Sequence, residues 1–153
     1  MPSFPKTLVL RHRKENVNKC SLSGLETRED LRFFTYPNDM LPDLSQVILL
    51  TISAPELSVQ DRDRQLLLID GTWKYAKVME TFVLKQGLVE KRSLPAHLRT
   101  AYPRKQSDCE DPSRGLASIE ALFIAHRILK RTVEGLLDRY YWKEAFYKQN
   151  HLM

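Results

Sequence analysis

Residues 66–76 read LLLIDGTWKYA, an apolar run that stops at the tetrapeptide Asp-Gly-Thr-Trp. An apolar run without polar alternation is typical of a strand that is covered on both faces, as in a parallel sheet. Thr72 can cap a helix that extends to about residue 84. The stretch therefore predicts a buried strand, a short turn and a helix.

The rest of the chain repeats this alternation of apolar runs and amphipathic segments. Such an order favours an α/β fold with a mainly parallel sheet. A chain of 153 residues suits one hydrophobic core, so we expect a single domain over residues 1–153. The expected strands are 7–11, 31–35, 46–52, 66–70 and a less regular one at 88–94, and the expected helices are 72–84, 116–131 and 133–149.

Composition limits the class of protein. No stretch reaches the roughly 18 consecutive apolar residues that a membrane span requires. Positive charge at the start of the chain follows the first apolar run, which is the wrong order for a signal peptide, so we expect a cytoplasmic protein. Cys20 and Cys109 lack the C-x-x-C or C-x-x-H neighbours of a zinc site, and we expect two free thiols and no metal.

The charge is unevenly distributed. The net charge is +5, and residues 1–25 carry five Lys or Arg against one acid. Residues 85–105 carry six against one. Clustered basic residues are typical of a protein that binds a polyanion, whereas the alternative is a solvated surface that happens to be basic.

Asp70 is the first candidate functional residue. In a parallel α/β sheet, ligands bind beyond the carboxyl ends of the strands, and Asp70 ends such a strand. Gly71, the next residue, permits a close approach of the backbone. The alternative is an ordinary helix cap followed by a packed Trp73.

Two further stretches carry groups suited to an anionic ligand. In residues 114–122, Ser118 can act as a helix N-cap and Glu120 lies in the first turn, where exposed amides could bind a carboxylate or a phosphate. The alternative is simply a well-capped helix. In residues 18–26, two serines and a glycine resemble an anion-binding turn, although the stretch is not a P-loop. The four histidines show no partner pattern, and we assign them no metal or proton-transfer role.

Together these stretches resemble the DTW-domain family and its sister family, the rRNA aminocarboxypropyltransferases. IDGTW at 69–73 is similar to the signature D-[TGC]-[ST]-W, and GLASIEAL at 115–122 is similar to L-S-[TC]-x-E-A. Further similarities, in the same order along the chain as in the family, are KCSLSGL at 19–25, YPND at 36–39, SLPAHLRTAYP at 93–103 and WKEAFYKQN at 142–150.

The resemblance implies a single SPOUT-like α/β domain with a C-terminal trefoil knot. It implies transfer of the 3-amino-3-carboxypropyl group from S-adenosylmethionine to a uridine-type base in RNA, which leaves methylthioadenosine. A tRNA uridine, modified at N3, is the preferred substrate and rRNA the second. The alternatives are a SPOUT-type RNA methyltransferase and a basic RNA-binding domain without catalysis. We expect a monomer, because the predicted C-terminal helix could cover the surface through which many SPOUT enzymes dimerise.

The resemblance also implies roles for the two catalytic candidates. Asp70 either takes the imide proton of the uridine, which we favour, or fixes a backbone turn. Trp73 packs against the methyl and sulfonium region of the cofactor, with a cation–π contribution. Glu120 is expected to be structural and to bond loop amides in the knot.

Binding roles follow in the same way. Hydroxyls of Ser21 and Ser118, with a helix N-terminus, are expected to hold the carboxylate of the amino acid group. The adenine is expected to contact main chain around Leu94, Tyr102 and Leu116. The basic residues expected to contact RNA phosphates are Lys19, Arg99, Arg104 and Lys105.

The chain departs from the family patterns in two places. Bacterial-type DTW proteins carry a cysteine-rich zinc element near the N-terminus, and this chain has only Cys20 there. Ala117 stands where the second signature has a serine, so one hydroxyl is missing. KCSLSGL is more similar to the rRNA-modifying branch, and IDGTW is more similar to the tRNA branch. The resemblance therefore specifies the cofactor more closely than the substrate RNA.

Overall fold

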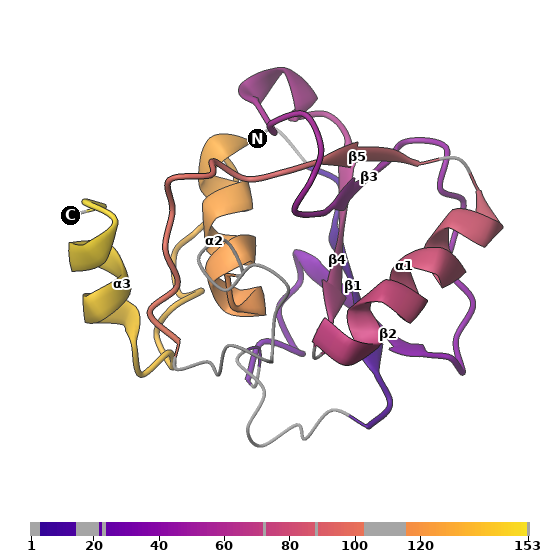
Figure 1. Ribbon diagram of the computed structural model, residues 1–153, viewed down its shortest axis with the longest axis horizontal. Coiled ribbons are helices and arrows are strands. Elements are labelled where there is room, and N and C mark those ends of the chain that lie inside the picture. The colour runs from indigo at the N-terminus through magenta and orange to yellow at the C-terminus, as the bar shows by residue number, and fades with distance from the viewer. Residues whose placement is uncertain are drawn as a thin grey trace.

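The computed structural model describes residues 4–14, 22, 24–71, 73–87, 89–102 and 116–152, and for residues 73 and 74 it describes the backbone only. Every expected strand is present, with slightly shifted ends. In chain order the elements are β1 (Thr7–His12), β2 (Leu31–Tyr36), β3 (Val47–Leu50), the 3-10 turn η1 (Val59–Asp61), β4 (Gln65–Asp70), α1 (Trp73–Gln86), β5 (Glu90–Arg92), α2 (Ser118–Ile128) and α3 (Lys143–Gln149) (Figure 1).

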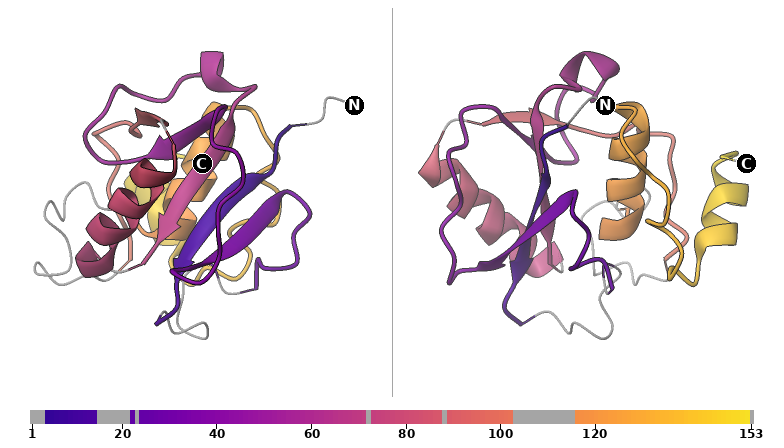
Figure 2. Two further views of the ribbon diagram at one scale, coloured as in Figure 1. Left: turned by 90° about the vertical axis from the view of Figure 1, so that its right-hand side faces the viewer. Right: turned by 180° about the vertical axis from the view of Figure 1, so that it is seen from behind.

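Within the described residues the strands form one five-stranded sheet in the order β2-β1-β4-β3-β5. All four neighbouring pairs are parallel, which confirms the α/β prediction. Figure 2 shows α1 on one face of the sheet and α2 on the other, with α3 outside α2. Both faces are thus covered, which explains why β3 and β4 are apolar along most of their length.

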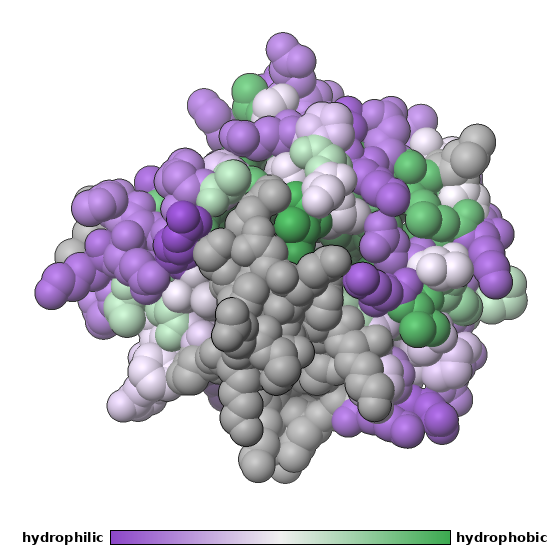
Figure 3. Space-filling model, in the orientation of Figure 1, coloured by the Kyte–Doolittle hydropathy of each residue, from purple (hydrophilic) through white to green (hydrophobic). Residues whose placement is uncertain are grey.

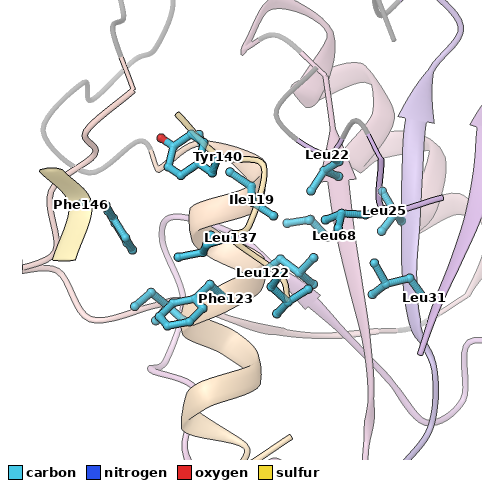
Figure 4. Packing of buried hydrophobic residues seen from close by; sticks show 14 of the residues in the cluster. Leu22, Leu25, Leu31, Leu68, Ile119, Leu122, Phe123, Leu137, Tyr140 and Phe146 are labelled. Atoms are coloured by element: carbon cyan, nitrogen blue, oxygen red, sulfur yellow. The ribbon is translucent and has the colours of Figure 1, made fainter. Parts of the chain in front are cut away.

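Each face of the sheet has its own apolar cluster. On the α1 face, Leu8 and Leu10 of β1 pack with Met79 and Val83 of α1. On the α2 face, Leu68 belongs to a larger cluster that joins the sheet to α2 and to the C-terminal segment; Figure 4 labels its members Leu22, Leu25, Leu31, Leu68, Ile119, Leu122, Phe123, Leu137, Tyr140 and Phe146. Burying a leucine of this kind contributes about 1.5–3 kcal/mol.

The chain reverses its direction of travel across the sheet between β1 and β4. From β1 it continues to β2 on one side, whereas from β4 it continues through α1 to β5 on the other side. Such a switch point in a parallel sheet is where ligands bind, beyond the carboxyl ends of the two strands. Arg11 of β1 and Asp70 of β4 are register partners at these ends.

The segment that follows β5 lies outside α2. Residues 93–102 pass over α2 and then run between α2 and α3 (Figures 1 and 2). On the opposite side of the molecule, α1 carries the exposed apolar residues Val78 and Leu84. Figure 3 shows apolar side chains on the right-hand side of the view, where α1 lies. Over the described part of the chain, no helix has the length and apolarity that a membrane span needs.

The helix predicted over 133–149 is wrong in its first half, because only Lys143–Gln149 are helical. Gly135 has a φ of +80°, which a right-handed helix does not allow, and residues 134–139 form successive turns instead. The helix predicted over 116–131 ends at Ile128. Lys130, with a φ of +58°, turns the chain out of the helix there.

Candidate functional site

The two signature stretches meet at the carboxyl edge of the sheet. The Ser118 hydroxyl donates to Oδ1 of Asp70 at 2.8 Å, although the two residues are 48 positions apart in the chain. Asp70 is 3% exposed, so this bond lies in the protein interior. The proton of Ser118 is used in it, because a carboxylate can only accept. The hydroxyl oxygen of Ser118 therefore acts as an acceptor toward any other group.

A third residue, which the sequence did not indicate, completes this arrangement. Arg11 Nε donates to Oδ2 of Asp70 at 3.1 Å, and its guanidinium lies 4.7 Å from the ring centroid of Phe33. Arg11 Nη1 lies 3.7 Å from Oε2 of Glu26, and Oε1 of Glu26 accepts the amide N–H of Gly24 at 2.7 Å. The three stretches singled out in the sequence, 18–26, 69–73 and 114–122, are thus joined through Arg11.

The expected capping role of Ser118 is wrong. Ala117 occupies the N-cap position of α2 and Ser118 is the first helical residue, because the Ser118 side chain is engaged with Asp70. The side chain of Glu120 instead accepts the N–H of Ala117 at 2.8 Å. An alanine at the N-cap leaves the first-turn amides without a side-chain acceptor from that residue, and the helix dipole favours an anion there.

Glu120 is a buried carboxylate that organises the loop before α2. Besides Ala117, it accepts from the Thr100 hydroxyl at 2.6 Å and from the Ala101 amide at 2.8 Å. The Tyr140 hydroxyl donates to the same carboxylate at 2.8 Å. The prediction that Glu120 bonds loop amides is confirmed.

Asn150 holds the same loop from the other side. Its Oδ1 accepts the N–H of Arg99 at 2.7 Å, and its Nδ2 donates to the Arg99 carbonyl at 2.8 Å. The Arg99 side chain is exposed, and Nη1 donates to the carbonyls of Ala96 and Leu98. This guanidinium thus stabilises its own turn, and its expected contact with RNA stays a prediction.

The residues expected to line an adenine site all border the same large apolar cluster, and their role stays a prediction. Leu94, Tyr102 and Leu116 are all half-buried, and all three pack against the large apolar cluster on the α2 face. Leu94 and Tyr102 belong to the loop held by Glu120 and Asn150, and Leu116 precedes Ser118. Tyr102, next to two residues that bond to Glu120, and Leu116 lie near the N-terminus of α2. Leu94, in contrast, also packs against a cluster that includes Ala125 and Leu129 at the C-terminal end of that helix.

Several expected site residues lie outside the described part of the structure. These are Ser21, Lys19, Arg104 and Lys105. For Trp73 the backbone is described and begins α1. Leu22 is fully buried in the cluster on the α2 face.

Gly71 and His12 close the other side of the strand end. A Cβ at Gly71 would lie 3.1 Å from Met79 Sδ and 3.5 Å from His12 Cβ, so a larger residue would require the Met79 side chain to shift by a few tenths of an ångström. The His12 ring stacks on Tyr75 at 3.9 Å. Burial, together with the charges of Arg13 and Lys14, lowers the pKa of His12.

In the described ranges, no three His, Cys, Asp or Glu side chains gather as metal ligands would.

Comparison with known proteins supplies one structural neighbour. No protein-family model matches the chain, and no curated protein matches it. The chain is similar in structure to the SAM-dependent rRNA:acp-transferase Tsr3 from Vulcanisaeta distributa, with a TM-score of 0.73 and 23% sequence identity. The match covers 98% of this chain and 80% of that chain. At this level of identity the likeness shows a shared fold.

Proposed function

We propose that this protein transfers the 3-amino-3-carboxypropyl group of S-adenosylmethionine to a uridine-type base in RNA and leaves methylthioadenosine. The observation that carries the proposal is the hydrogen bond between Ser118 and Asp70, since it joins the two family-like signatures at the switch point of a parallel sheet. The described activity of the structural neighbour, an rRNA:acp-transferase that depends on SAM, supports the same reading.

The donor set around the N-terminus of α2 fits an amino acid group with both charges. The helix end favours a carboxylate. The Ser118 hydroxyl donates its hydrogen to Asp70, so its oxygen is suited to accept a hydrogen bond from an ammonium group. We therefore propose that Ser118 binds the amino group, and that the first turn of α2, with Ser21, binds the carboxylate. Half-buried Leu94, Tyr102 and Leu116 suit an adenine ring.

When bound, S-adenosylmethionine supplies a sulfonium centre that makes the adjacent carbons electrophilic. The protein's part is to orient the groups and to remove a proton. We propose that Asp70, held by Ser118 and Arg11, accepts the imide proton of the uridine. Trp73, at the start of α1, is proposed to pack against the methyl group so that the carboxypropyl carbon faces the RNA.

Ribosomal RNA is the first substrate to test, because it is named for the structural neighbour. A tRNA uridine is the second, on the likeness of IDGTW to the tRNA branch. The basic residues Lys19, Arg99, Arg104 and Lys105 are proposed to contact phosphates, which predicts steeply salt-dependent binding.

The finer fold assignment is also a proposal. We propose a single SPOUT-like domain with a C-terminal trefoil knot, in which α2 passes through the loop that begins with residues 93–102. The position of α2 between the sheet and that segment (Figure 1) supports it. Residues 103–115, which would close the loop, lie outside the described residues. We further propose a monomer, because Leu137, Tyr140 and Phe146 cover α2 on its outer side.

Equilibrium binding of S-adenosylmethionine to wild type and to two serine variants tests the site. Ser118→Ala should weaken binding by more than about tenfold, since it leaves Asp70 short of a donor and removes an acceptor for the ligand. Ser45→Ala, at an exposed turn far from the sheet's carboxyl edge, is the control. Equal affinity of all three proteins would rule out this site, and failure of wild type to bind would exclude the proposed cofactor.

A further inference from the structure

Arg11 lies in the site although no motif of the sequence pointed to it. It is the register partner of Asp70 across the β1–β4 pair. Its side chain is 11% exposed and that of Asp70 is 4% exposed. Burying a charged pair of this kind carries a desolvation cost that can offset the attraction between the charges, so stability alone does not account for the pair.

The guanidinium of Arg11 is fixed on three sides. Nε donates to Asp70, Nη1 faces Glu26, and the flat face of the group lies over the Phe33 ring. An arginine can make these contacts at once because its guanidinium is planar and presents several donors in fixed directions. A lysine ammonium reproduces the charge without the fixed directions.

Arg11 determines how the Asp70 carboxylate is oriented. Oδ1 accepts from Ser118 of α2, and Oδ2 accepts from Arg11 of β1. Two donors from two different elements prevent the carboxylate from turning about its Cβ–Cγ bond. Without Arg11, the contact that opposes this rotation at Oδ2 is lost.

We propose that Arg11 is a positioning residue for the transfer step, because it fixes the direction in which Asp70 meets the imide of the uridine. Through Glu26, which also holds the Gly24 amide, it ties residues 24–26 to the same carboxylate. This inference rests on the proposed function. It predicts that a change at Arg11 affects the rate of transfer and leaves cofactor affinity unchanged, whereas a change at a cofactor-binding residue affects affinity.

The experiment compares Arg11→Gln and Arg11→Lys with a matched control, Arg32→Gln. Arg32 lies on β2 with its guanidinium 4.9 Å from the Phe34 ring centroid, and its side chain is exposed. Cofactor affinity and the single-turnover rate of transfer, at saturating cofactor and RNA, are measured separately. Arg11→Gln should keep the affinity and lose roughly 100-fold in rate, the order expected for a misplaced reacting group. Arg11→Lys should recover part of that rate, and Arg32→Gln should match wild type.

Equal losses of affinity and rate in Arg11→Gln would overturn the inference, as would a wild-type rate. If Arg11→Gln does not fold, Arg11→Lys is compared with wild type instead, by cofactor affinity and by single-turnover rate. Crystal structures of wild type and variant give a readout that needs no activity: rotation of the Asp70 carboxylate away from Ser118 supports positioning, and an unchanged carboxylate contradicts it. If wild type transfers no group, the proposed function is wrong, and the crystal structures alone decide the role of Arg11.

Discussion

The side-chain amide of Asn150 pairs with both backbone groups of Arg99, as a neighbouring strand would. It accepts the Arg99 N–H at 2.7 Å and donates to the Arg99 carbonyl at 2.8 Å, and it also donates to the Phe146 carbonyl at 3.0 Å. The end of α3 thereby holds the middle of the 93–102 segment, 51 residues earlier in the chain. The C-terminal helix is thus part of the support for the proposed adenine site.

Asn150→Asp tests this support with almost no change in shape. The new carboxylate places an acceptor against the carbonyls of Arg99 and Phe146, where a donor is needed. We expect a loss of about 1–3 kcal/mol in the free energy of unfolding, together with weaker binding of S-adenosylmethionine, measured by denaturation and by calorimetry. Gln149→Glu, the same chemical change at the exposed neighbouring position, should leave both quantities near wild type. If Asn150→Asp binds S-adenosylmethionine with unchanged affinity, α3 does not support the proposed cofactor site.

Glu120→Gln should be among the more destabilising substitutions. The carboxylate is fully buried and accepts four hydrogen bonds, from Thr100, Ala101, Ala117 and Tyr140. Glutamine replaces one acceptor oxygen by an NH2 group that faces these donors. We expect a loss of about 2–4 kcal/mol in urea denaturation. Glu144→Gln at an exposed position of α3 is the control, and similar stability of the two variants would contradict the network.

The buried His126 predicts a pH dependence of stability. Its Nε2 lies 2.8 Å from the Thr7 hydroxyl and its Nδ1 lies 3.1 Å from the Thr132 carbonyl. Burial lowers the pKa of His126 below its usual value, so the unfolded chain binds a proton there more readily than the folded one. This contribution to stability is complete above about pH 6.5 and decreases as the pH falls below that value, by at most about 1.4 kcal/mol per pH unit.

His126→Gln removes that contribution. Urea denaturation of wild type and variant between pH 5 and pH 8 should show a shallower decrease toward acid in the variant. His97→Gln, at an exposed histidine, should follow wild type. Identical slopes for wild type and His126→Gln would show that this histidine does not govern acid sensitivity.

Gly24 should resist substitution where Gly87 does not. Gly24 has a φ of +90°, and a Cβ there would lie 2.7 Å from Arg139 Nη1. Gly87 shows ordinary contacts, with the nearest atom at 3.5 Å. Gly24→Ala should therefore cost about 1 kcal/mol or more of unfolding free energy, whereas Gly87→Ala should be neutral or slightly stabilising. Thermal denaturation compares the two, and a Gly24→Ala protein as stable as wild type would exclude strain at this turn.

Local patterns predicted the strands and the signature residues, and tertiary contacts decided the rest. The apolar runs placed β3 and β4 because both faces of the sheet are covered. The apolar residues over 133–149 suggested one helix, but Gly135 and the bond from Tyr140 to Glu120 direct that segment differently.

The contacts of Ser118 and Arg11 in the site could not be predicted from local sequence patterns either. Ser118 had the right residue type for an N-cap, yet its hydroxyl bonds to a residue 48 positions away. Arg11 is the penultimate residue of the largely apolar strand β1, and its role became visible only with the register of β1 beside β4. Pairings between distant segments of this kind leave no local periodicity to detect.

The most direct test of the proposed transfer uses S-adenosylmethionine with one label in the carboxypropyl chain and a different label in the methyl group. Purified protein is incubated with this cofactor and with rRNA or tRNA that lacks the modification, and RNA nucleosides and small-molecule products are then separated. We expect the carboxypropyl label to enter a uridine-type nucleoside while the methyl label stays in methylthioadenosine. Methyl label in the RNA, or tight cofactor binding with neither label transferred to any RNA, would contradict the proposed transfer.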